Sequence, residues 1–97
     1  LGGMSNVPNG DYSAVVGGRN NIADNGGSFS AVIGGNFNRA DSSYATVLGG
    51  KSNDADGSYS AVVGGTNNIA DGDYSAVLGG KDNMATADDA VVVGDPS

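Results

Sequence analysis

The chain has 97 residues, which is enough for one domain. It contains 18 glycines and no cysteine, histidine or tryptophan, which excludes disulfide bonds, thiolate metal sites and catalytic sites built on cysteine or histidine. The formal net charge of −7, with four cationic side chains in all, argues against a partner that is nucleic acid or an anionic membrane. No apolar run could span a bilayer, so we expect no direct membrane insertion by this segment. We also expect no cofactor and no bound metal.

One phrase recurs along the chain: an aromatic residue, four small or β-branched residues, and two glycines. Its first complete copy is Tyr-Ser-Ala-Val-Val-Gly-Gly at positions 12–18, and an altered last copy begins at Asp89. The copies between them begin at Phe29, Tyr44, Tyr59 and Tyr74. The glycine pairs are fifteen residues apart except for one interval of seventeen. A short fixed period indicates one structural unit stacked on copies of itself, so residues 1–97 are predicted to form one solenoid of about six coils, cut from a longer fibre protein.

Each coil is predicted to contain two short strands and two corners. The β-branched segment at 12–16 is typical of a strand, and Gly17-Gly18 can adopt the positive φ angles of a tight corner. A second short segment follows at 20–23, and an aspartate-glycine turn such as Asp56-Gly57 returns the chain to the next strand. With ~4.8 Å between coils, the rod should be about 30 Å tall.

The single interval of seventeen residues contains two extra residues in a turn. This candidate epitope loop comprises Asp24, Asn25, Gly26, Gly27 and Ser28. Since the extra residues cannot join the stack, we expect them to protrude, where they could bind a partner. The alternative is a neutral loop insertion, which solenoids tolerate.

The main strand is apolar on both faces. Alternation places Ala14 and Val16 on one face and Ser13 and Val15 on the other. A strand that is apolar on both faces is usually buried on both, and a thin coil has only one interior, so another copy of the chain is predicted to cover the second face through cyclic symmetry. The alternative is an exposed apolar stripe, and which face lines the assembly axis stays open. The residues predicted to pack in the core or between copies are Val15, Val16, Val32, Ile33, Val47, Leu48, Val62, Val63, Val77, Leu78, Val92 and Val93.

An asparagine recurs at one position of every coil. The column comprises Asn6, Asn21, Asn38, Asn53, Asn68 and Asn83. Side-chain amides at strand spacing can form hydrogen bonds up and down a stack, which predicts a structural ladder. Glycan or metal binding is the alternative.

Two further columns carry acidic and aromatic side chains. Asp24, Asp41, Asp56 and Asp71 form a carboxylate column, for which we expect Asx-turn hydrogen bonds, with Ca²⁺ binding as the alternative. The aromatic column begins at Tyr12 and ends at Tyr74, and Phe29 lies within it without a hydroxyl group. That substitution favours packing in the core or at a corner over stacking against a bound sugar. Asp89 ends the column, which suggests a boundary of the solenoid there.

The repeat Ser-Ala-Val-Val-Gly-Gly-x-x-Asn-x-Ala-x-Gly-x-Tyr resembles the YadA-like head repeats of trimeric autotransporter adhesins. The later alanine of that repeat is matched by Ala23, Ala40, Ala55, Ala70 and Ala85. This chain differs in placing its small residue second, as Ala14, and in doubling the glycine. The resemblance implies an all-β fold, a left-handed parallel β-roll. It also implies that three such chains stand side by side as a homotrimer. It also implies an extracellular fibre head on a bacterial surface, anchored through a C-terminal region outside this segment.

These observations favour an adhesive fibre-head module that binds a host-surface protein or glycan. A segment of a phage or predator attachment fibre is the alternative, because related glycine-rich repeats occur in phage tail fibres. An ice-binding solenoid requires regular rows of threonine. Here Thr46, Thr66 and Thr86 fall at different positions of their repeats, which argues against that function. We do not expect an enzyme, because no serine has a histidine partner, and Lys51 and Lys81 are two coils apart.

Overall fold

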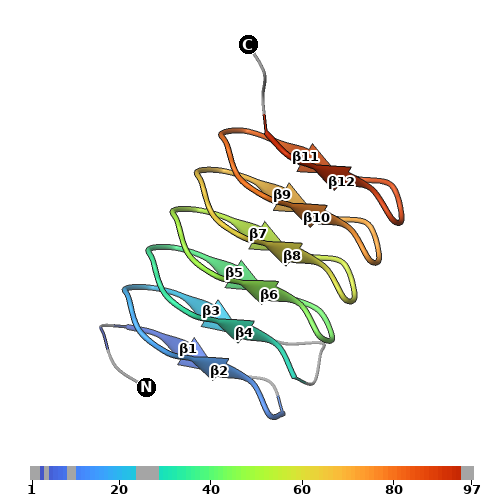
Figure 1. Ribbon diagram of the computed structural model, residues 1–97. Coiled ribbons are helices and arrows are strands. Elements are labelled where there is room, and N and C mark those ends of the chain that lie inside the picture. Colours follow the sequence, from blue (N-terminus) through green and yellow to red (C-terminus); the bar gives the residue numbers. More distant parts are fainter. Residues whose placement is uncertain (1–2, 4, 9–10, 24–28, 95–97) are drawn as a thin grey trace.

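The computed structural model describes residues 3, 5–8, 11–23 and 29–94 as an all-β solenoid. Twelve strands of two residues each form two parallel six-stranded sheets (Figure 1). The described residues contain no helix, and therefore none that could cross a membrane. The predicted fold class, a parallel solenoid with coils of about fifteen residues, is confirmed.

The chain alternates between the two sheets, so one sheet holds the odd-numbered strands and the other the even-numbered strands. The odd sheet consists of β1 (Val7–Pro8), β3 (Ile22–Ala23), β5 (Arg39–Ala40), β7 (Asp54–Ala55), β9 (Ile69–Ala70) and β11 (Met84–Ala85). The even sheet consists of β2 (Ala14–Val15), β4 (Ala31–Val32), β6 (Thr46–Val47), β8 (Ala61–Val62), β10 (Ala76–Val77) and β12 (Val91–Val92).

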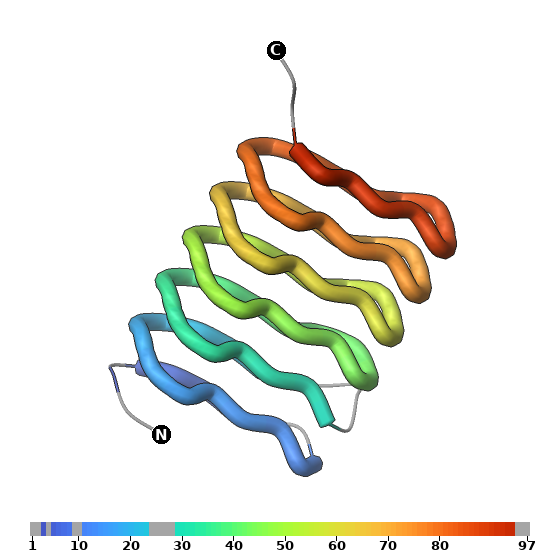
Figure 2. The backbone as a smooth tube through the Cα atoms, viewed as in Figure 1, coloured from blue at the N-terminus to red at the C-terminus, as the bar shows by residue number. Residues whose placement is uncertain are grey.

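The coils form a flattened rod with β1 and β12 at opposite ends of the stack (Figure 2). Its extents are 35 × 22 × 11 Å, close to the expected height. Equivalent residues fifteen positions apart pair in register, as Val62 does with Val77. Across the longer interval the partners are seventeen apart, as for Val15 and Val32, so the insertion leaves the stacking register intact. The candidate epitope loop, 24–28, lies outside the described residues.

The interior is a single thin layer between the sheets. Valines of the even sheet meet alanines of the odd sheet, because sheets this close leave room for only one branched side chain per level. The fully buried valines are Val32, Val47, Val62 and Val77, and Val15 is almost as buried. The alanines opposite them are Ala23, Ala40, Ala55, Ala70 and Ala85. Val92, at the last level, is partly buried against this core.

The predicted asparagine ladder is present and makes the corner beside the glycines. Asn53 Nδ2 donates to the carbonyl oxygens of Gly49 and Gly65, at 3.0 Å each. Its Oδ1 accepts a hydrogen bond from the backbone N–H of Asn68 at 2.9 Å. The same three bonds recur for the buried asparagines of the column, so each of these amides joins its own coil to the next one and supplies partners for backbone groups at the corner.

The two glycines of each pair have different roles at this corner. Gly50 has a φ of +93°, and a Cβ atom there would lie 2.3 Å from the carbonyl oxygen of Gly65. Gly49 has no positive φ, and a Cβ atom there would have no neighbour within 4 Å. Only the second glycine is therefore required by the conformation and packing of the coil.

Substituting the second glycine is expected to destabilise the solenoid far more than substituting the first. Gly50→Ala should lower the free energy of unfolding by about 2–3 kcal/mol through backbone strain and displacement of the next coil. Gly49→Ala should stay within about 1 kcal/mol of the parent chain. Urea unfolding followed by far-UV circular dichroism measures both, and equal losses for the two variants would contradict the assignment.

Candidate interaction surface

The outer face of the even sheet carries three parallel apolar columns. The aromatic column comprises Tyr12, Phe29, Tyr44, Tyr59 and Tyr74. The middle column is of small residues and comprises Ala14, Ala31, Thr46, Ala61 and Ala76. The aliphatic column comprises Val16, Ile33, Leu48, Val63 and Leu78, whose side chains are 41–48% exposed. Val91 and Val93 continue the last two columns, so the face runs along the whole stack.

The structure shows which face holds each of the valines, leucines and isoleucine that were predicted to pack in the core or between copies. Val15, Val32, Val47, Val62 and Val77 point into the coil and form its own core. Their neighbours in the aliphatic column point outward and are exposed in the single chain. The face available to another copy is therefore the one that contains Val16 and its equivalents.

The aromatic rings lie at the edge of this face and stack on one another. Successive ring centroids are 4.6–5.1 Å apart and the ring planes differ by 13° or less. The column lies at a corner, as predicted, but its rings pack against each other and remain exposed instead of entering the core.

Every aromatic residue of the column has a left-handed backbone. The φ angles run from 56° for Tyr12 to 68° for Phe29, a conformation that side chains of this size rarely adopt. The backbone N–H of Tyr59 donates to Ser43 of the preceding coil at 2.9 Å, so hydrogen bonding between coils holds this conformation in place. Stacking of adjacent rings, worth roughly 0.5–1.5 kcal/mol per pair, offsets part of the strain.

The outer face of the odd sheet is different because it carries charged side chains. Its outward positions are Val7, Ile22, Arg39, Asp54, Ile69 and Met84. Arg39 and Asp54 are adjacent in register and interrupt the apolar column. Of the two outer faces, only that of the even sheet has an unbroken aliphatic column among the described residues.

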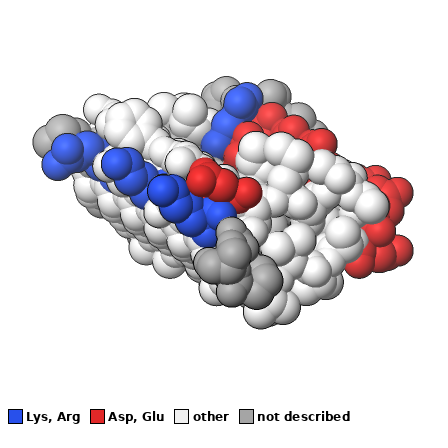
Figure 3. All heavy atoms as spheres, turned by 90° about the horizontal axis from the view of Figure 1, so that it is seen from above, with Lys and Arg blue, Asp and Glu red and all other residues white. Residues whose placement is uncertain are grey.

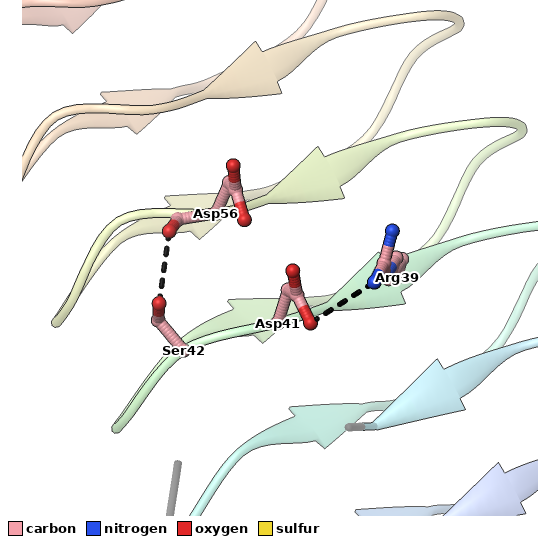
Figure 4. Close-up of polar contacts among 4 residues, drawn as sticks. All are labelled: Arg39, Asp41, Ser42 and Asp56. Carbon is pink, nitrogen blue, oxygen red and sulfur yellow. Dashed lines mark hydrogen bonds and ion pairs between the residues drawn. The ribbon is translucent and has the colours of Figure 1, made fainter. Parts of the chain in front are cut away.

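Arg39 and the neighbouring aspartates form a small charged cluster on the odd sheet. The guanidinium of Arg39 lies 3.2 Å from Asp41 Oδ1, in an ion pair that lacks the alignment of a hydrogen bond (Figure 4). Ser42 Oγ donates to the backbone oxygen of Asp56 at 2.9 Å, which joins the two coils (Figure 4). Asp54 Oδ1 is buried without a hydrogen-bond partner. Burial, reinforced by the negative charge of Asp56, raises the pKa of Asp54 to about 6, although Arg39 acts in the opposite direction.

Asp54 is expected to make the solenoid less stable as the pH rises. Its pKa is higher in the folded chain than its ordinary value of 3.8, so folding favours the protonated form. This favourable contribution is complete below pH ~4 and disappears as the pH rises through about 6. We expect a change of about 1 kcal/mol, since solvent screens a carboxyl group that is only partly buried.

The variant Asp54→Asn isolates this effect because it carries no titratable group. It should be about 1 kcal/mol more stable than the parent chain at pH 7.5 and equal to it at pH 3.5 in urea unfolding. Parallel pH profiles for the two chains would show that other carboxyl groups cause the pH dependence.

The carboxylate column shows crowding between like charges. A side-chain hydrogen bond with Asp56, aided by desolvation and by the charge of Asp56, raises the pKa of Asp71. Among the residues that the structure describes, no three acidic side chains are grouped so that they could hold a metal ion. Asp24, the first member of the column, lies outside that part of the chain.

The corner beside the glycine pairs contains an open depression of about 530 Å³. Its lining residues are Gly3, Gly18, Arg19, Gly35 and Asn36. These described residues supply one cation, Arg19, and one side-chain amide, Asn36.

No known protein-family model matches this sequence, and no curated protein does either. The repeat, the solenoid and its exposed faces are therefore the observations on which a function can be proposed.

Proposed function

We propose that this chain is the structural and adhesive head segment of a trimeric fibre on a bacterial surface, where it attaches to a host-surface protein or glycan. The observation that carries the proposal is the outer face of the even sheet. Its aliphatic column is unbroken over the height of the stack, and a face of this kind on a stable extracellular protein requires a cover.

A second and a third copy of the same chain provide that cover most simply. The rod is 22 Å wide and 35 Å long, which is the scale of a stable interface that buries about 800 Å² per partner. Three such slabs with their even sheets toward a common axis enclose the aliphatic column of every chain. The charged outer face of the odd sheet then faces solvent.

The mass of the chain in solution tests the assembly. Sedimentation equilibrium should give three times the mass of one chain, 9.4 kDa, at micromolar concentration. A mass of one chain at every concentration would overturn the trimer. A mass of two or four chains would retain the covered face and reject the three-fold symmetry.

Attachment is tested separately with fluorescent beads that carry the purified chain. The beads are applied to cultured epithelial cells, to an array of immobilised animal glycans, and to intact bacterial cells. Binding to the epithelial cells or the array supports a host adhesin, while binding confined to bacterial cells supports a phage or predator fibre. Beads that carry heat-unfolded chain are the control, and equal binding by both would reject an adhesive role for the folded head.

A further inference from the structure

The positive charges of the rod gather on one long edge. Three of the four cationic residues of the chain, Arg19, Lys51 and Lys81, occupy the same position of alternate coils beside the glycine corner. Seen down the stack, lysine and arginine side chains form a row along one side of the molecule (Figure 3). They are exposed, and the one ion pair among the described residues joins Arg39 to Asp41 elsewhere. We call this row the basic edge; among the described residues, Asp82, next to Lys81, is the one acidic residue on it.

The opposite long edge, at the turn that precedes each even strand, is acidic. Its described acidic residues are Asp11, Asp41, Asp56, Asp71, Asp73, Asp88 and Asp89. No lysine or arginine of the chain occupies a position in this turn. Asp56 and Asp71 directly follow Ala55 and Ala70, which pair in register, so like charges lie at adjacent levels of this acidic edge within one chain.

We infer that the basic edge of one copy lies against the acidic edge of the next, and that this seam fixes the parallel orientation and the relative height of the copies. The inference rests on the assembly in the proposed function. The charge complementarity of the two edges identifies a second copy of this chain as the partner of each edge.

The position of the edges follows from the course of the coil. Each even strand begins just after the acidic turn and ends at the glycine corner, so the two charged edges border the apolar outer face on its two sides. When the apolar faces of parallel copies turn toward a common axis, the left edge of each copy meets the right edge of its neighbour. An antiparallel pair would bring basic edge to basic edge and acidic edge to acidic edge, which like-charge repulsion disfavours.

Rotation about an axis parallel to the rod leaves heights unchanged, so corresponding coils meet at the seam. Lys51 and Asp56 belong to one coil, and Lys81 and Asp88 belong to another. Lys51 of one copy therefore meets the turn that carries Asp56 of the next copy. A shift by one coil would place Lys51 beside a different level of the acidic edge and would leave part of the apolar face uncovered.

Three charge-reversal variants of the whole chain test the seam. The first, Lys51→Glu with Lys81→Glu, makes both edges acidic. The second, Asp56→Lys with Asp88→Lys, adds cations to the acidic edge. The third combines all four substitutions and reverses the signs of the two matched pairs, position 51 with 56 and position 81 with 88, while Arg19 and the other aspartates keep their charges. All four substituted positions are on the coil surface at its corners, and far-UV circular dichroism checks that each variant is folded.

Sedimentation at low ionic strength gives the outcome. We expect the midpoint concentration for dissociation to rise at least tenfold for the first and second variants and to return to within about threefold of the parent for the third. The third variant, carrying a distinguishing dye, should not exchange into parent trimers, because the seams between the two kinds of chain would repel. Added salt should reduce the differences.

The results separate failure of the seam from failure of the assembly. A parent chain that is monomeric throughout overturns the proposed trimer and the seam with it. A parent trimer whose dissociation is the same in all four chains overturns the seam alone. In that case, loss of heparin binding by the first variant would assign the basic edge to an anionic glycan instead.

Discussion

The variant Val62→Asp is expected to unfold the solenoid, whereas Val63→Asp should separate the copies and leave the coil folded. Val62 is 0% exposed within its own coil and Val63 is 41% exposed on the outer face of the even sheet. A carboxylate at position 62 would be buried without a partner. This should lower the free energy of unfolding by more than about 4 kcal/mol. A carboxylate at position 63 meets water in the single chain and loses that water only when another copy covers the face.

Thermal unfolding and sedimentation on the same samples check this pair. Val62→Asp should lack the far-UV signal of the parent at 25 °C, and Val63→Asp should keep it while sedimenting as a single chain. The control is Met84→Asp, which adds the same charge at an exposed position on the outer face of the odd sheet, away from the apolar face and from both charged edges. A fully assembled Val63→Asp variant would remove the support that the apolar face gives to the proposed assembly.

The second large effect is expected from the asparagine ladder. Asn53→Leu preserves the approximate shape of the side chain but removes its three side-chain hydrogen bonds. The backbone N–H of Asn68 and the carbonyl oxygen of Gly49 would then lose their partners, whereas Gly65 keeps a bond from the backbone of Lys51 at 2.9 Å. One buried N–H and one partly buried carbonyl without partners should lower the free energy of unfolding by about 2–4 kcal/mol.

Urea unfolding measures this loss, with Thr66→Leu as the matched control in the same corner. Thr66 lies two positions before the ladder and is half-buried, so leucine there should change stability by less than about 0.5 kcal/mol. If Asn53→Leu were as stable as the control, the ladder would be a consequence of the stacking and not a cause of its stability.

Both effects should spread beyond the coil that is altered. Each coil contacts only its neighbours, so a broken level at position 53 or 62 divides the stack into shorter pieces. A piece of two or three coils has too little core to remain folded alone, and unfolding of one level should therefore propagate. Hydrogen exchange on the weakened variants should show early loss of protection in β7 and β8, followed by their neighbours.

The sequence by itself determined the solenoid. The fifteen-residue spacing of Gly49, Gly64 and Gly79 predicts a coil stacked on copies of itself. The alternation along residues 59–63 places successive side chains on opposite faces of the strand. The asparagine ladder was equally predictable, because identical amides at strand spacing bring donors and acceptors together. All of these inferences depend on local geometry repeated at a fixed interval.

Only the tertiary structure decided which apolar face is the core and which is exposed. Val62 and Val63 are the same residue type in adjacent positions, and nothing in their chemistry distinguishes inside from outside. The choice is made by the closing of the second sheet, whose Ala55 and Ala70 lie on one side of the valine strand and exclude Val63. The left-handed backbone of Tyr59 and the division of charge between two edges likewise arise from how the corners fold, because they depend on which parts of separate coils are brought into line.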